Sequence, residues 1–191
     1  MPRNVRGDRA LSMREIRVAF FRNLNLGQAR SHSPTSQQLL DAFVAAGARD
    51  PSHVGANGTV VYRYPAGPSL TRRVVRLLTP VCGYQDMVTV RSGQWLLGLD
   101  RRLRDLGEGE VVQYDTSPGL VVEPTIESDD GLVVTWMDHR AAIVSHRPGT
   151  HPVTAGPFVA DLVGVPTTAR SIATMRRVID RVREYAQRSP L

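Results

Sequence analysis

Short apolar runs alternate with amphipathic stretches along the first half of the chain. Residues 17–21 are almost wholly apolar, which is typical of a buried strand. Residues 35–46 place Leu39, Leu40 and Phe43 at helical spacing behind hydroxyl residues that can cap a helix. The same pattern predicts a helix at 70–78 and strands at 53–56, 59–64 and 87–91. The predicted order is therefore β-α-β-β-α-β, the split βαβ plan.

The second half also mixes strands and helices, without repeating the first half's sequence. Helical spacing predicts helices at 93–106, 157–162 and 172–187, and strand patterns occur at 110–115, 120–124, 132–137 and 141–145. Residues 167–171 fit either a brief strand or a capping turn before the last helix. We therefore predict an α+β fold of two ferredoxin-like (βαββαβ-type) subdomains with antiparallel sheets. The expected parts are a flexible tail at 1–13, a first domain at 14–92, and a second domain at 93–191 that ends in a long helix.

The charge of the chain is strongly basic and carried by one residue type. The net charge is +6, and all 24 basic residues are arginine. Arginine contacts phosphate well, so nucleic acid is one predicted partner. Codon bias in a GC-rich genome is the other explanation, and we favour it. Arginine clusters such as Arg72, Arg73 and Arg76 fall on predicted helices, where a solvated face explains them.

Several classes of protein are disfavoured by what the sequence lacks. No apolar window approaches the length of a membrane span, so we expect a soluble protein with no membrane partner. A single cysteine, Cys82, excludes an internal disulfide and fits a reducing cytoplasm. No metal-ligand spacing, nucleotide-binding motif or catalytic triad pattern is present, so we predict neither a metal nor a cofactor. Whether the protein is an enzyme is left open.

The main candidate site follows the first apolar strand. Arg22, Asn23, Asn25 and Gly27 provide a guanidinium, two amides and a flexible glycine. Open α/β sheets place ligands at such strand ends, and these groups suit a phosphate or carboxylate. The alternative is a plain turn in which Arg22 pairs with a nearby acid.

Two further segments contribute candidate binding residues. Asn57 and Gly58 form a hairpin signal, since both residues tolerate positive φ. Thr168, Arg170 and Thr174 lie just before or at the start of the last predicted helix, where free N–H groups attract anions. The alternative for the hydroxyls is a simple helix cap. A cation is unfavourable at this end of a helix, so we expect an anionic partner for Arg170.

These three segments together resemble the bacterial domain-of-unknown-function family 1697. That family's patterns read roughly Arg-Gly-Ile-Asn-Val-Gly-Gly, Gln-Ser-Gly-Asn-Val-Val-Phe and Thr-Thr-Arg-Asn-Trp-Asn-Thr. The matches are Arg22, Asn25, Gly27, Gly58, Thr168, Arg170 and Thr174, whereas Asn23 and Gln28 replace glycines, Thr59 an asparagine, and Ser171 and Ile172 the Asn-Trp pair. The resemblance covers residues 16–185 and implies two ferredoxin-like α+β domains, without implying an activity.

Three functions are consistent with these patterns. The first is the binding of an anionic small molecule in a cleft near Arg22 and Arg170. The second is weak, sequence-independent binding of nucleic acid through arginine-bearing surfaces. The third is a protein–protein interaction module. The sequence leaves the oligomeric state and the ligand's identity open.

Overall fold

The computed structural model describes residues 13–28, 33–65, 69–117, 126–148 and 154–188. The chain divides into two compact units, the first comprising residues 1–101 and 177–191 and the second residues 102–176. The fold is mixed, with one antiparallel sheet in each unit, as the predicted α+β class requires. Among the described residues, no helix is both long and apolar enough to span a membrane.

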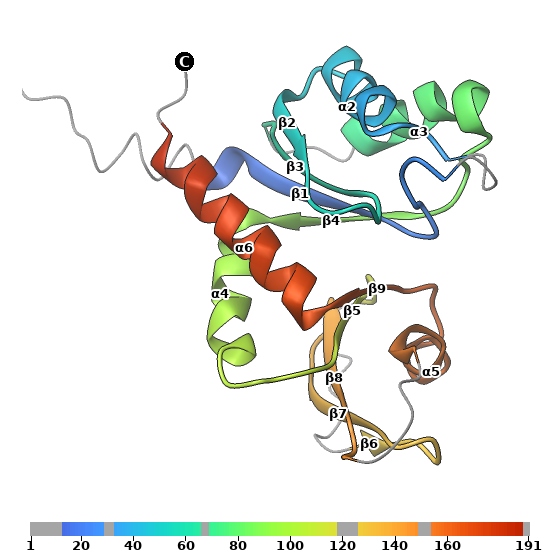
Figure 1. Ribbon diagram of the computed structural model, residues 1–191, viewed down its shortest axis with the longest axis vertical. Coiled ribbons are helices and arrows are strands. Elements are labelled where there is room, and N and C mark those ends of the chain that lie inside the picture. The colour runs from blue at the N-terminus through green and yellow to red at the C-terminus, as the bar shows by residue number, and fades with distance from the viewer. Residues whose placement is uncertain (1–12, 29–32, 66–68, 118–125, 149–153, 189–191) are drawn as a thin grey trace, which may run out of the picture. The chain divides into compact units, whose positions relative to one another are not determined.

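The sheet of the first unit has four strands in the order β2-β3-β1-β4 (Figure 1). The elements follow one another as β1 (Ile16–Phe21), α2 (Ser36–Ala45), β2 (Arg49–His53), β3 (Thr59–Arg63), α3 (Ser69–Cys82) and β4 (Val88–Ser92). Every neighbouring pair of strands is antiparallel. The predicted β-α-β-β-α-β order of elements is therefore confirmed for this unit.

Helices α2 and α3 cover one face of this sheet (Figure 1). Phe21 of β1 packs edge-on against Phe43 of α2, and Phe43 also packs against Tyr62 of β3. Helix α2 begins where predicted, because Thr35 and Gln38 form a reciprocal capping box. The core between helices and sheet is apolar and fixes β1 at the centre of the sheet.

The C-terminal part of the last helix, α6 (Ile172–Gln187), belongs to the first unit. The guanidinium of Arg63, which is almost fully buried, donates to the carbonyl oxygens of Tyr185 and Arg188. The hydroxyl of Tyr185 donates in turn to the carbonyl oxygen of Asp50. These bonds join α6 to β2 and β3, so the unit is built from both ends of the chain. The linear boundary expected after residue 92 falls inside this unit.

The sheet of the second unit has five strands in the order β6-β7-β8-β5-β9 (Figure 1). Helix α4 (Gly93–Leu103) is followed by β5 (Glu110–Gln113), β6 (Ile126–Glu127), β7 (Leu132–Met137), β8 (Ala141–His146), α5 (Ala155–Val163) and β9 (Thr168–Ser171). Helix α5 packs on one face of the sheet through Ala155 and Val159. Among the described residues, the four strands β5 to β8 thus follow one another before helix α5. This departs from the βαββαβ order expected here. The strand predicted at 120–124 lies outside the described residues.

Candidate functional site

The segment after β1 is a loop, as the sequence predicted. Strand β1 ends at Phe21, and the chain turns at Asn23, which has a φ of 53°, and at Gly27, which has a φ of 73°. Leu24 and Leu26 alternate with exposed residues and are buried. The loop is therefore anchored by its apolar positions. Asparagine is among the few residues other than glycine that adopt the left-handed conformation at low cost.

Gly58 packs directly beneath this loop. The Cβ of any larger residue at Gly58 would lie 2.9 Å from the Cβ atoms of both Phe21 and Leu24. The amide of Phe21 donates to the carbonyl oxygen of Gly58 at 2.9 Å, and that of Leu26 donates to Ala56 at 2.6 Å. The first two sequence motifs thus form one structural unit, and Gly58 is required by a close backbone approach.

Asp86, in the loop between α3 and β4, ties the end of β1 to that loop. Its Oδ2 accepts a hydrogen bond of 2.8 Å from Nδ2 of Asn23, and its Oδ1 lies 3.5 Å from Nη1 of Arg22. The amide of Met87 donates to Oδ1 at 2.7 Å. The hydroxyl of Tyr84 donates to the carbonyl oxygens of Arg22 and Met87. The expected alternative for Arg22, pairing with a nearby acid, is therefore observed.

A pocket of about 340 Å³ opens beside Asp86, between α3 and β4. Its walls combine charged, hydroxyl and aliphatic side chains, namely those of Thr71, Arg72, Val75, Arg76, Asp86 and Val88. Asp86 is the one carboxylate among these residues, and its oxygens are already engaged by Arg22 and Asn23. The charge left uncompensated in the pocket is therefore positive.

Arg72 and Arg76 provide that positive charge. They stand four residues apart on α3, so their guanidinium groups leave the same face of the helix one turn apart. Both side chains are exposed, and neither pairs with a carboxylate within the described part of the chain. Like charges at this spacing repel each other and destabilise the helix slightly. An anion bound between them would relieve that repulsion.

The third predicted segment lies in the second unit. Thr168 and Arg170 are on the edge strand β9, and both are buried. Nη1 of Arg170 donates to Oγ1 of Thr168 at 3.0 Å and to the carbonyl oxygen of Ala169 at 2.7 Å. Oγ of Ser171 accepts from the amide of Thr174 at 3.2 Å, so Ser171 is the residue that caps α6. An anionic partner for Arg170 stays a prediction.

The predicted site residues thus fall into two groups. Arg22, Asn23 and Gly58 come together in the first unit, where Asn25 and Gly27 are exposed on the same loop. Oδ1 of Asn57, beside them, accepts a long hydrogen bond from Oγ1 of Thr59. Thr168, Arg170 and Thr174 form the second group, in the other unit. A cleft that contains both Arg22 and Arg170 stays a prediction.

Asp86 was not singled out from the sequence, whereas the solvated helix face expected at Arg72 and Arg76 agrees with the exposed side chains of both residues. Nothing in the residues around Asp86 distinguishes it from other loop acids. The pocket beside these arginines was not predicted, because a sequence does not show which groups lie opposite an exposed helical position. The available signal was that Arg72 and Arg76 stand four residues apart on a predicted helix, 70–78, that contains no acidic residue.

Comparison with known proteins supports the fold. No family model matches the sequence, and no curated protein matches it. Among solved structures, the conserved bacterial protein SP0830 from Streptococcus pneumoniae is similar, with a TM-score of 0.59 over 88% of this chain and 98% of that chain. The two sequences are 12% identical. At this identity the similarity concerns the fold.

Proposed function

We propose that the protein binds a small anionic molecule at the first unit's arginine pocket, defined as the pocket lined by Thr71, Arg72, Val75, Arg76, Asp86 and Val88. The observation that carries the proposal is the pair Arg72 and Arg76, two exposed guanidinium groups one helical turn apart that lack a carboxylate partner among the described residues. Planar guanidinium groups bind phosphate and carboxylate oxygens in pairs of parallel hydrogen bonds.

Arg22 and Asn23 support this pocket indirectly. They hold the carboxylate of Asp86 in place, away from pairing with Arg76. The positive charge of Arg22 also offsets part of the repulsion between this carboxylate and an incoming anion. Val75 and Val88 add aliphatic surface to the same pocket. A ligand that carries one anionic group and a short apolar part fits these walls best.

The proposal is tested by the stabilisation that inorganic phosphate gives the folded protein. A ligand that binds only the native state stabilises it and raises the melting temperature, by an amount that grows with the logarithm of ligand concentration above the dissociation constant. We expect phosphate to raise the melting temperature of the wild-type protein and of the control Arg101→Ala, an exposed arginine on α4. Arg72→Ala and Arg76→Ala should lose this effect, at equal ionic strength set with chloride. Equal shifts in all four proteins would reject the pocket.

We further propose that the chain is a member of domain-of-unknown-function family 1697 and that its first unit has the ferredoxin-like plan. The order β2-β3-β1-β4 and the positions of Arg22, Gly58 and Arg170 support this assignment. A solved family member whose corresponding arginines lie elsewhere than after the first strand and on the last strand would contradict it. We also propose that the protein is bacterial and cytoplasmic. Fractionation of the cells that produce it tests the cytoplasmic location.

A further inference from the structure

The second unit contains a pocket of about 360 Å³ that none of the predicted site residues explains. It lies where the start of β5, the end of β8, the start of α5 and the junction of β9 with α6 meet. The residues that line it are Gly107, Glu108, Gly109, Glu110, His146, Thr154, Ser171, Ile172 and Ala173. Two carboxylates, one imidazole and two hydroxyls therefore face a space large enough for a small organic molecule.

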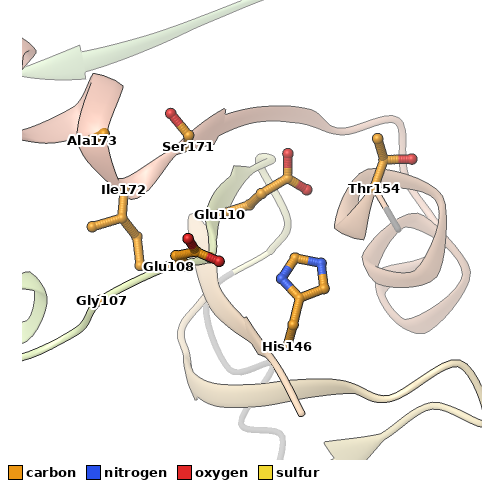
Figure 2. A pocket seen from close by; sticks show the side chains of 9 residues that line it. Gly107, Glu108, Glu110, His146, Thr154, Ser171, Ile172 and Ala173 are labelled. Atoms are coloured by element: carbon orange, nitrogen blue, oxygen red, sulfur yellow. The ribbon is translucent and has the colours of Figure 1, made fainter. Parts of the chain in front are cut away.

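Neighbouring strands bring these groups together. The antiparallel register pairs Glu110 of β5 with Val144 of β8, so the residues before Glu110 and those after Val144 lie at the same end of the two strands. Glu108, which precedes β5, and His146, the last residue of β8, line the same pocket at that end. Figure 2 shows the side chains of Glu110 and His146 directed into the same space, with Thr154 on the far side. The imidazole and both carboxylates are thus presented from the ends of two adjacent strands.

The position of Glu110 is fixed by the start of helix α5. Its Oε2 accepts a hydrogen bond of 2.6 Å from the amide of Ala155, the first residue of that helix. Thr154 occupies the N-cap position but makes no side-chain capping bond, so Glu110 performs this role from a distant strand. The carboxylate is therefore preorganised, and only one of its two oxygens is used by the helix.

The charge of this pocket is opposite to that of the chain. The protein carries 24 arginines, yet none of the described residues that line the pocket is an arginine. Neither Glu108 nor Glu110 pairs with an arginine within the described ranges. Elsewhere carboxylates do so repeatedly, as at Glu15, Asp50, Asp100, Glu127, Asp180 and Glu184. Among the described residues that line the pocket, the two carboxylates are therefore accompanied by no arginine.

A bound metal ion does not fit this arrangement. Among the described residues, no three histidine, cysteine or carboxylate side chains are close enough together to hold one ion. The donors are instead spread around a volume that suits several ligand atoms.

We propose that this pocket binds an organic ammonium compound, with its cationic nitrogen between Glu108 and Glu110 and its carbon chain against Ile172. This inference is independent of the anion proposed for the first unit.

The test is a titration of the full chain with 1,4-diaminobutane, followed by backbone amide NMR. 1,4-Butanediol, which has the same length without charge, is the matched probe. We expect the diamine to shift the amide signals of Glu108, Glu110 and His146 saturably, and the diol to leave them unchanged. Glu108→Gln and Glu110→Gln remove the charges while a glutamine at 110 keeps an oxygen acceptor for Ala155. Each should weaken binding of the diamine about tenfold, which is the typical effect of losing one charge-assisted hydrogen bond.

Asp161→Asn is the control, because Asp161 is an exposed acid on α5 outside the pocket. It should bind the diamine as tightly as the wild-type protein does. Equal affinity of the wild-type and Glu108→Gln proteins would overturn the proposal. Equal shifts with the diol would also overturn it, as would diamine-induced shifts spread over surface acids instead of gathered at the pocket. Because Glu108 is exposed, we expect Glu108→Gln to fold as the wild-type protein does. A loss of binding in this variant therefore reports on the pocket.

Discussion

Asn23 and Asp86 are joined by a hydrogen bond of 2.8 Å between Nδ2 and Oδ2, across 63 residues of sequence. Asn23 follows the central strand β1, and Asp86 precedes the edge strand β4, which pairs with β1. The bond therefore closes the end of the sheet next to the arginine pocket. It also fixes Asp86 at the pocket's edge, where its charge is shared with Arg22.

Asn23 should tolerate glycine better than alanine. Its φ of 53° lies in the left-handed region, which costs a β-carbon residue about 1 kcal/mol or more, and alanine also loses the bond to Asp86. We expect Asn23→Ala to lower the free energy of unfolding by about 1–2 kcal/mol, and Asn23→Gly by less than about 1 kcal/mol. Urea denaturation measures both. Asn25→Ala, at an exposed position of the same loop, should change little; equal losses at the three variants would contradict the account.

Gly58 should be far less replaceable than Gly83, although both have positive φ. A Cβ at Gly58 would lie 2.9 Å from two neighbouring Cβ atoms, whereas one at Gly83 would meet no atom within 4 Å. Both alanine variants suffer the backbone strain, and only the first suffers the clash. We expect Gly58→Ala to cost about 2–4 kcal/mol and Gly83→Ala about 1 kcal/mol in unfolding free energy. Similar values from chemical denaturation would show that close packing at Gly58 is unimportant.

Phenyl phosphate should bind the arginine pocket more tightly than inorganic phosphate does. Val75 and Val88 line that pocket beside the two arginines, and burying an aromatic ring against them adds a hydrophobic contribution. We expect several-fold tighter binding in isothermal titration calorimetry. The gain should shrink in Val75→Thr, which keeps the shape of the side chain and replaces one methyl group with a hydroxyl. An identical affinity for the two phosphates would show that Val75 and Val88 do not contribute to binding of the phenyl ring.

Stability should fall in alkaline solution because of Tyr62. Burial of this side chain raises its pKa well above the ordinary value of 10.0. Above that pH the unfolded chain releases the phenolic proton while the folded protein retains it, so the unfolded state is favoured. We expect the free energy of unfolding to decrease by up to about 1.4 kcal/mol per pH unit above pH 10 from this group. Denaturation between pH 8 and 11 measures the slope, which Tyr62→Phe should reduce.

Binding to single-stranded RNA should be weak and independent of base sequence. The arginines are dispersed, and the sequence carries no base-reading motif, so phosphate contacts would supply the affinity. Fluorescence anisotropy at two salt concentrations measures this, with affinity expected to fall steeply as salt rises. Tight binding that is insensitive to salt would contradict the prediction. Loss of RNA binding in Arg72→Ala but not in Arg101→Ala would assign the RNA to the arginine pocket.

Local patterns in the sequence determined most of the elements. The strand 132–137 and the helix 172–187 have the predicted bounds, because each has a clear apolar period and a distinct start. The loop after β1 was equally visible, since an abrupt change from apolar to polar residues marks a strand end. Gly58 was recognised as a turn residue, but its close contact with Phe21 and Leu24 depends on a segment more than 30 residues away.

Only the tertiary structure decided which side chains share a pocket. Asp86 meets Arg22 because β4 pairs with β1, and Arg72 and Arg76 face the same pocket because α3 packs on that sheet. Glu108, Glu110 and His146 meet because β5 and β8 are adjacent, although nearly 40 residues separate them. Burial and charge balance at such places depend on contacts between distant segments. A linear pattern records the tendency of each segment to form a helix or a strand, whereas the pairing of strands selects the neighbours.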